Sequence, residues 1–394
     1  MSAVYLNAVG VVCALGSGPD ALRAALAAPP EDSLVFSDAC SPGRVLPLGR
    51  VRTPLPALPP EWPAPLHSRN NALAAAALEP LRAPVQALLD RYGPTRVAAV
   101  VGTSAAGVAE GEAAMRLRQR DGAWPAGFHY GQMEMGGAAA GVARALGLRG
   151  PAYGISTACS SGAKALAAGA RLLRAGIADA VVAGGVDALG GLTVAGFSAL
   201  DSVSATRCNP MSAKRCGINL GEGAALFLMT RDEGPVRLAG WGETGDAHHM
   251  SAPDPSGRGA ADAMRLALAR AGVGPGVVDY LNLHGTATPQ NDAMESRAVA
   301  EVLGLELPAS STKPLTGHAL AAAGAVEAAI AWVTLAGNPA GHLPPHLWDG
   351  ERDAALPPLA LVAPGQALGR APRWIMSNSF AFGGSNAALL FAGA

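Results

Sequence analysis

Charged residues are scarce in this sequence. Only 15% of its 394 residues are Asp, Glu, Lys or Arg, against about 25% in a typical globular domain. The 29 basic and 30 acidic residues leave a formal net charge of −1, so the chain has no overall positive field to hold a nucleic acid backbone. Half of the residues are apolar, which excludes a disordered chain, because disorder combines few apolar residues with many charges.

Cysteine is also rare, and long hydrophobic runs are absent. An odd number of scattered cysteines does not fit a disulfide framework and favours a reducing cytoplasm. Long uncharged stretches are interrupted by Gly, Pro, Asn or His, so none predicts a membrane helix. Residues 1–19 are uncharged but lack the basic start of a secretory signal, and their alternation predicts a buried first strand. The cysteines are Cys13, Cys40, Cys159, Cys208 and Cys216.

Short β-branched runs alternate with Ala-rich stretches along the chain. Residues 97–101, 179–183 and 278–283 are typical of strands that are covered on both faces. Residues 163–175 and 319–336 predict helices between such strands. The alternation predicts an α/β fold with buried sheets, and the length fits two fused halves of about 200 residues each.

A faint internal repeat supports the two halves. Residues 156–162 align with 311–317, and residues 221–226 align with 384–389, at nearly the same separation. We therefore expect an N-terminal half, residues 1–232, and a C-terminal half, residues 233–394. The turns at residues 156–162 and 311–317 would then face each other where the two halves meet.

Cys159 is the candidate nucleophile. It lies among small residues, S-T-A-C-S-S-G, after an apolar segment and before an Ala-rich helix. A cysteine at a helix N-terminus faces unpaired N–H groups, which lower the pKa of its thiol. The alternative is a buried and inert cysteine, which is the commoner fate of a free thiol.

Two histidines and a glycine-rich loop lie in comparable places. His284 follows a buried strand and precedes a glycine, which predicts a position in a ligand crevice. His318 lies just before a helix, where the repeat places its version of the cysteine turn. The loop in residues 377–386 allows close backbone approach and can supply an N–H to an oxyanion. Each feature alone also fits a satisfied polar residue or a tight turn, and no spacing indicates a metal site.

Together these motifs resemble those of the β-ketoacyl-acyl carrier protein synthases, the elongating condensing enzymes of the thiolase superfamily. The carrying segments are 156–162, 284–289, 313–318 and 382–386, and the resemblance extends over nearly the whole chain. It implies a thiolase-like fold, in which two similar α/β halves stack as five αβαβα layers. It also implies a dimer, either of identical chains or with a homologous subunit.

The resemblance implies a decarboxylative Claisen condensation. Cys159 would take an acyl chain from the phosphopantetheine arm of an acyl carrier protein. His284 and His318 would stabilise the enolate that forms when malonyl-acyl carrier protein loses carbon dioxide. No cofactor is implied beyond the phosphopantetheine that carries the substrates.

The family pattern assigns further roles residue by residue. Lys313 would set the charge around the site, with Glu295 as its acidic partner. Thr286 and Thr288 would touch the pantetheine arm. Phe382 would act as a gate and as an oxyanion donor.

The acyl carrier protein is usually acidic, so the resemblance also implies a local basic patch. The candidates lie in the segment 116–120 and at one arginine upstream. A solvated helix face is the alternative for these side chains. The four residues are Arg69, Arg116, Arg118 and Arg120.

The sequence departs from the family pattern in two places. Ala381 stands where glycine is usual, which predicts a stiffer gate. In residues 209–217, Met211, Ser212 and Cys216 replace a Phe and two Asp, which predicts an altered structure near the acyl pocket. These departures favour a specialised pathway to polyene or polyketide-like products, such as aryl polyenes, over housekeeping fatty acids.

Three related activities fit the sequence less well. A non-catalytic chain-length partner of a related ketosynthase would lack the nucleophile, whereas this chain keeps Cys159 and both histidines. A degradative thiolase would need a second cysteine in the C-terminal half, and none follows Cys216. A priming synthase would have an asparagine where His318 stands.

Overall fold

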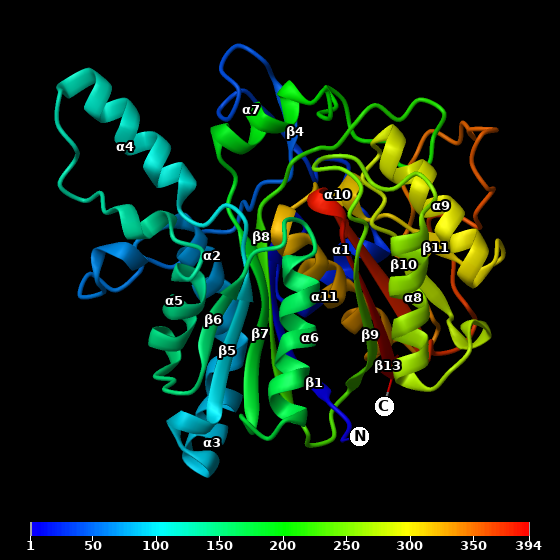
Figure 1. The fold of residues 1–394 in the computed structure, drawn as a ribbon, viewed down its shortest axis with the longest axis horizontal. Coiled ribbons are helices and arrows are strands. Elements are labelled where there is room, and N and C mark those ends of the chain that lie inside the picture. The colour runs from blue at the N-terminus through cyan, green and yellow to red at the C-terminus, as the bar shows by residue number, and fades with distance from the viewer. Residues whose placement is uncertain (1, 394) are drawn as a thin grey trace.

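The computed structural model describes residues 2–393, and one main sheet runs through both halves of the chain (Figure 1). The strands of the N-terminal half are, in spatial order, β1 (Tyr5–Cys13), β8 (Gly223–Thr230), β7 (Ala180–Asp187), β5 (Val97–Gly102) and β6 (Ala152–Ile155). Those of the C-terminal half are β9 (Val236–Gly245), β13 (Ser385–Gly393), β12 (Trp374–Ala381), β10 (Tyr280–Asn282) and β11 (Ala309–Ser310).

The two sets of strands have the same topology. In each set the first two neighbouring pairs are antiparallel and the next two are parallel. β1 and β9 pair at two positions, Tyr5 with Arg237 and Leu6 with Val236, and this short seam joins the halves. The predicted division at residues 232 and 233 falls in the connection between β8 and β9.

Helices cover these strands in layers. The central helices α6 (Ser161–Arg174) and α11 (Ala323–Leu335) contact strands of both halves, and both lie near the middle of the molecule (Figure 1). The outer helices are α2 (Arg69–Leu78), α3 (Arg82–Tyr92) and α5 (Gly137–Leu146) on the N-terminal half, and α8 (Arg258–Ala271) and α9 (Pro289–Leu303) on the other. The result is the predicted αβαβα arrangement.

The remaining elements are short or peripheral. α1 packs against α11, whereas α4 projects from the body of the molecule at the upper left of Figure 1. No helix among residues 2–393 has the length and apolarity that crossing a lipid bilayer requires. The bounds are α1 (Pro19–Ala27), α4 (Val108–Asp121), α7 (Gly191–Ala199), α10 (Lys313–Thr316), β2 (Gly16–Ser17), β3 (Val35–Ser37) and β4 (Leu46–Leu48).

The central helices approach each other closely because small residues line their contact. A Cβ atom on Gly162 would lie 2.7 Å from the carbonyl oxygen of Ala321 and 3.0 Å from the backbone nitrogen of Ala325. A Cβ atom on Gly324 would lie 3.1 Å from the Cβ atom of Ala163. The chain therefore uses glycine and alanine where α6 and α11 begin, and this brings the turns before the two helices together.

We predict that Gly162→Ala lowers the free energy of unfolding by about 2 kcal/mol, because backbone atoms of the neighbouring helix cannot retreat from the new methyl group. Urea unfolding followed by circular dichroism measures the change. Gly196→Ala in α7 is the matched control, because a Cβ atom there would meet open space. The control should be neutral or slightly stabilising. Equal stability of the two variants would contradict close packing at Gly162.

Candidate active site

The turn that carries Cys159 lies between β6 and α6. Ala158 has a φ of 51°, a left-handed conformation that is costly for a residue with a side chain. Ser161 holds this turn, since its Oγ accepts from the Thr157 N–H at 2.8 Å and donates to the Ala158 carbonyl at 2.6 Å. This turn places Cys159 directly before Ser160, the N-cap of α6, and Cys159 is 6% exposed.

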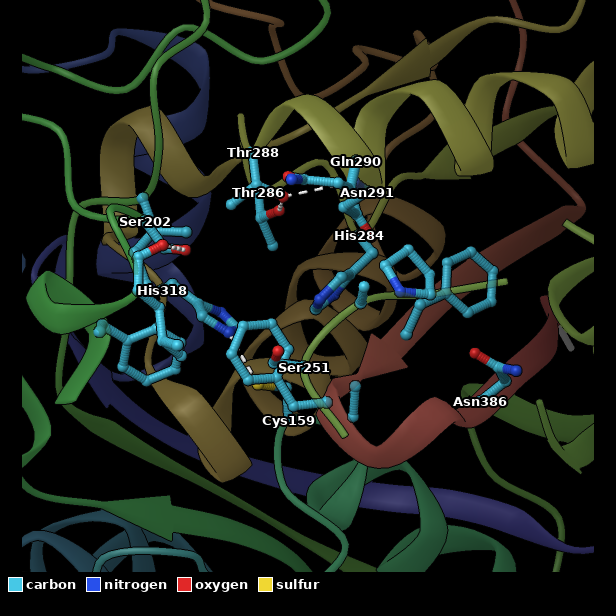
Figure 2. A pocket seen from close by; sticks show the side chains of 18 residues that line it. Cys159, Ser202, Ser251, His284, Thr286, Thr288, Gln290, Asn291, His318 and Asn386 are labelled. Atoms are coloured by element: carbon cyan, nitrogen blue, oxygen red, sulfur yellow. Dashed lines mark hydrogen bonds between the residues drawn. The ribbon is translucent and has the colours of Figure 1, made fainter. Parts of the chain in front are cut away.

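The structure brings the three candidate catalytic side chains together. The Nε2 atom of His318 lies 2.9 Å from the Sγ atom of Cys159. The ring of His284 is edge-on to that of His318, with centroids 5.3 Å apart and an angle of 82°. Figure 2 shows both rings pointing toward the same space, with Cys159 beside His318.

The helix N-terminus was expected to lower the pKa of the Cys159 thiol, but burial has the larger effect on that pKa. Burial raises the pKa of Cys159 to about 12, and this outweighs the lowering by Lys313 and by a backbone N–H. The expectation of a lowered pKa was therefore wrong in sign, because a cysteine at a helix N-terminus that is also sealed from water loses more solvation than the dipole returns. Cys159 is therefore a thiol at rest, and Nε2 of His318 is placed to take its proton.

Both imidazoles are neutral in the resting site. Burial, followed by the charge of Lys313 and then by His318, holds the pKa of His284 well below its usual range. Burial and Lys313 do the same to the pKa of His318. The ammonium of Lys313 lies 3.5 Å from Nδ1 of His284 and also donates to the His284 carbonyl oxygen. Because an ammonium only donates, Nδ1 accepts, and the ring proton of His284 resides on Nε2.

The acidic partner of Lys313 is Glu327, and not Glu295 as predicted. Lys313 and Glu327 form an ion pair in which both side chains are almost fully buried. Glu295 instead accepts the backbone N–H groups of His284 and Gly285, each at 2.7 Å. Glu295 thus positions the loop that carries His284. The prediction was wrong because the fold directs the carboxylate of Glu295 to those N–H groups and places that of Glu327 beside the ammonium of Lys313.

Sequence reasoning missed Glu327, although a signal for it was present. It is the one charged residue of α11, whose other residues are apolar, glycine or threonine. A lone carboxylate in a buried helix needs a cation to offset its desolvation. Burial raises the pKa of Glu327 to about 7 even with Lys313 beside it.

A pocket of about 130 Å³ opens onto the sulfur and both rings. Thr286 and Thr288 line it, their hydroxyls 3.1 Å apart, so both predicted pantetheine-contacting residues face this space. Thr288 also accepts the N–H of Asn291 and thereby caps α9. Other lining residues are Phe197, Leu200, Ser202, Ile218, Ser251, Gln290, Phe380 and Phe382 (Figure 2).

The glycine-rich loop bounds this pocket. The ring of Phe382 packs on that of Phe197, with centroids 5.3 Å apart. Gly383 and Gly384 have φ angles of 78° and 70°, so the turn itself needs glycine. Ala381 has an extended backbone, with φ −109°. Alanine adopts this conformation without strain, and the stiffer gate expected from Ala381 stays a prediction.

The second departure from the family pattern lies away from the pocket. Met211, Ser212 and Cys216 do not line the space around Cys159. Ser212 donates to Asp349 at 2.9 Å and Arg215 donates to Asp353 at 2.6 Å, so a later loop supplies carboxylates to this segment. Met211 lies beside Trp348 of that loop, whereas Cys216 contacts the hydroxyl of Ser204. The effect of the three replacements on the acyl pocket stays a prediction.

The four candidate docking arginines differ in their surroundings. Arg69 forms an ion pair with the buried Glu222 while its own side chain stays 34% exposed, so its docking role stays a prediction. Arg116 and Arg120 are exposed and pair with Glu112 and Asp121. The guanidinium of Arg118 lies over the ring of Trp124. Among residues 2–393, no group of His, Cys, Asp or Glu has an arrangement that would hold a metal ion.

We predict that Glu327→Gln lowers the free energy of unfolding by about 3–5 kcal/mol, because it leaves the buried charge of Lys313 uncompensated. Chemical unfolding at pH 8 measures the loss. Glu351→Gln removes the partner of Lys214 in an exposed ion pair and should cost less than about 1 kcal/mol. A loss of that small size at Glu327 would contradict the buried pair.

Family models and known proteins match this architecture. The model of the beta-ketoacyl synthase N-terminal domain matches residues 70–234, and that of the C-terminal domain matches residues 236–347. The chain is 34% identical over 265 residues to 3-oxoacyl-[acyl-carrier-protein] synthase 2 of Staphylococcus aureus. That match covers 62% of this chain and 64% of the relative, so it spans less than two thirds of the relative's length.

Solved structures match over the full chain. A chain of the ketosynthase ApeO in complex with its chain length factor ApeC, from Xenorhabdus doucetiae, is 39% identical with a TM-score of 0.94, and the match covers 100% of this chain and 98% of that one. A chain of the ishigamide ketosynthase/chain length factor is 25% identical with a TM-score of 0.87, covering 100% and 99%. With its thiolase-like halves and its gathered cysteine and histidines, the chain belongs to the beta-ketoacyl synthase family.

Proposed function

We propose that this chain is a catalytically active elongating β-ketoacyl synthase that condenses malonyl-acyl carrier protein with an acyl chain bound to Cys159. The observation that carries the proposal is the 2.9 Å contact between Sγ of Cys159 and Nε2 of His318, with His284 beside it in one pocket. Membership of the family supports a carbon–carbon bond-forming acyltransferase.

In the first half-reaction an acyl thioester enters the pocket. His318 Nε2 accepts the thiol proton while Sγ of Cys159 attacks the thioester carbonyl carbon. The backbone N–H groups of Cys159 and Phe382 stabilise the resulting oxyanion. Collapse breaks the bond to the pantetheine sulfur, which leaves with the proton, and the acyl chain stays on Cys159.

In the second half-reaction the malonyl thioester takes the vacated place. Charge builds up on its thioester oxygen as the carboxylate leaves as carbon dioxide. Once Sγ is acylated it no longer offers a proton to His318, so the neutral ring carries its proton on Nε2 instead of Nδ1. Nε2–H of His284 and Nε2–H of His318 then donate to that oxygen and lower the energy of the enolate. The enolate carbon attacks the acyl carbonyl, and collapse of this intermediate breaks the bond to Sγ and releases the elongated β-ketoacyl thioester. Sγ leaves as a thiolate and takes up one proton from water, which restores the thiol.

The positive charge of Lys313 supports both steps. It orients His284 so that Nε2–H faces the pocket, and it stabilises the negative charge that forms on sulfur and oxygen in a dry site. Glu327 keeps that ammonium in place. Thr286 and Thr288 line the path of the pantetheine arm.

A non-catalytic chain-length subunit is the second candidate. Two of the similar structures contain a chain length factor together with a ketosynthase. A non-catalytic chain-length partner would lack the nucleophile. The thiol–imidazole contact and the lysine behind His284 favour the catalytic role, because a subunit that only shapes the product needs neither.

We predict that incubation with acyl-acyl carrier proteins adds one acyl group to the protein, because His318 can deprotonate the buried thiol. Intact-mass spectrometry measures the adduct. Cys159→Ala should remain unmodified, whereas Cys216→Ala, which removes an exposed thiol, should be acylated like the natural sequence. Acylation that persists in Cys159→Ala would move the nucleophile elsewhere, and no acylation of any variant would favour the chain-length subunit.

We further propose that a second thiolase-fold chain covers the edge of the sheet at β6. Among residues 2–393, β6 pairs with β5 on one side and ends the sheet. Tyr153 of this strand is exposed, and Trp124 and Tyr130 are exposed on the loop that follows the projecting helix α4. Open strand edges and exposed aromatic side chains are typical of surfaces that a partner buries.

We predict a dimer of this chain, or of this chain with a homologue, in native mass spectrometry at micromolar concentration. Tyr153→Lys should shift the population toward monomer, because it places a charge on the open edge strand. Leu266→Lys changes an exposed leucine on α8, at the far side of the other half, and should leave the dimer intact. The proposal would be contradicted if the chain stayed monomeric and fully active, both alone and after a homologous chain was added.

The proposed pathway is the assembly of polyene or polyketide-like chains, such as aryl polyenes. The 39% identity to a chain of the ApeO–ApeC ketosynthase complex, over the whole length, supports this choice over a general fatty acid elongation enzyme. The proposed carrier-docking residues are Arg116, Arg118 and Arg120. They belong to α4, the helix that projects from the body of the molecule (Figure 1).

A further inference from the structure

Lysine is rare in this chain, and one lysine has no role in the chemistry described above. The sequence contains three lysines, with arginine at all other basic positions. Lys313 pairs with Glu327, and Lys214 pairs with Glu351 at the surface. Lys164 lies in the first turn of α6, half-buried, and forms no ion pair with a carboxylate among residues 2–393.

The partner of Lys164 is a hydroxyl at the start of β13. Its Nζ donates to Oγ of Ser385 at 2.6 Å. Oγ of Ser385 also lies 3.0 Å from Oγ of Ser160, which donates to the carbonyl oxygen of Thr157 at 2.8 Å. A continuous set of hydrogen bonds therefore connects the loop of the C-terminal half with the turn that holds Cys159.

Ser385 directly follows the glycine turn that carries Phe382. On its other side this loop is attached to the segment after β9, because Gly383 N–H donates to the Met250 carbonyl at 2.8 Å and Asn386 donates to Asp246 at 2.6 Å. Those two bonds hold the loop within the C-terminal half. The bonds through Ser385 attach it to the helix of the nucleophile.

Burying the ammonium of Lys164 against a hydroxyl costs folding free energy, which indicates a role other than stability. Burial lowers the pKa of Lys164, the positive charge of Arg171 lowers it further, and Glu243 opposes both. An ammonium that is withdrawn from water against a neutral hydroxyl is less well compensated than one against a carboxylate. A lysine also presents a compact charge that fits against one oxygen, whereas the broad guanidinium of arginine does not.

We propose that Lys164 is a positioning residue, which fixes the loop of Phe382 relative to the turn of Cys159 through Ser385 and thereby aligns the two N–H groups that stabilise the oxyanion. The inference rests on the proposed condensing function. The N–H of Cys159 and the N–H of Phe382 come from different halves of the chain, so their spacing depends on contacts between those halves. Lys164 and Ser160 on one side, and Ser385 on the other, form such a contact.

The test compares Lys164→Met, Ser385→Ala and the double variant. Methionine keeps the length of the side chain but removes its charge and donor. We expect each single variant to lose about tenfold to a hundredfold in the kcat of condensation, because displaced donors stabilise the oxyanion poorly. The KM for malonyl-acyl carrier protein should change by less than about twofold, since the substrate contacts remain. The double variant should be no slower than the slower single variant, because all three break the same contact.

A second readout does not depend on activity. Hydrogen exchange followed by mass spectrometry should show faster exchange in residues 382–386 of Lys164→Met and of Ser385→Ala, with the rest of the chain unchanged. Lys214→Met, which alters an exposed lysine, should match the natural sequence in kcat, KM and exchange. Thermal unfolding verifies that each variant is folded.

Three results would overturn the proposal: full kcat in both single variants, losses that multiply in the double variant, or unchanged exchange in residues 382–386. A change in KM alone would also reject it. If the natural sequence is not acylated at Cys159, the proposed function fails, while faster loop exchange in the variants would still support the contact. If the natural sequence is active and both variants match it, the role of Lys164 fails and the function stands.

Discussion

The contact between the thiol of Cys159 and the imidazole of His318 depends on how closely the two central helices approach. Each of these residues lies in the turn before a central helix, Cys159 before α6 and His318 before α11. The helices meet at glycine and alanine, where a single methyl group on Gly162 would lie 2.7 Å from a backbone oxygen. The Gly- and Ala-rich composition of the chain is therefore a condition for the site, because larger side chains would separate the two turns.

The same burial that permits this contact sets the electrostatics of the pocket. It keeps the thiol protonated and both imidazoles neutral at rest. A buried cation, Lys313, is then needed to orient His284 and to stabilise negative charge, and Glu327 is needed to hold that cation. The two buried charges are tolerated because each compensates the other.

The features of the protein that depend on short sequence motifs could be predicted from the sequence. Local patterns indicated the α/β alternation and, more faintly, the two similar halves. The gathering of Cys159, His284 and His318 was implied by the family resemblance, because each motif alone also fitted a structural role. The direction of the pKa shift of Cys159 did not follow, because it is set by how much water the surrounding layers exclude. The pairing of Lys313 with Glu327, and that of Arg69 with Glu222, join residues far apart in the chain, so only the fold reveals them.

The central claim is that one thiol and two imidazoles join carbon chains. A single-turnover reaction tests it most directly: protein carrying an acyl group on Cys159 is mixed with malonyl-acyl carrier protein labelled with ¹³C in its free carboxyl group. The account predicts labelled carbon dioxide in a one-to-one ratio with loss of the acyl group from Cys159, and an acyl chain longer by two carbons on the carrier. Release of carbon dioxide while the acyl group stays on Cys159, or loss of the acyl group as free acid, would contradict it.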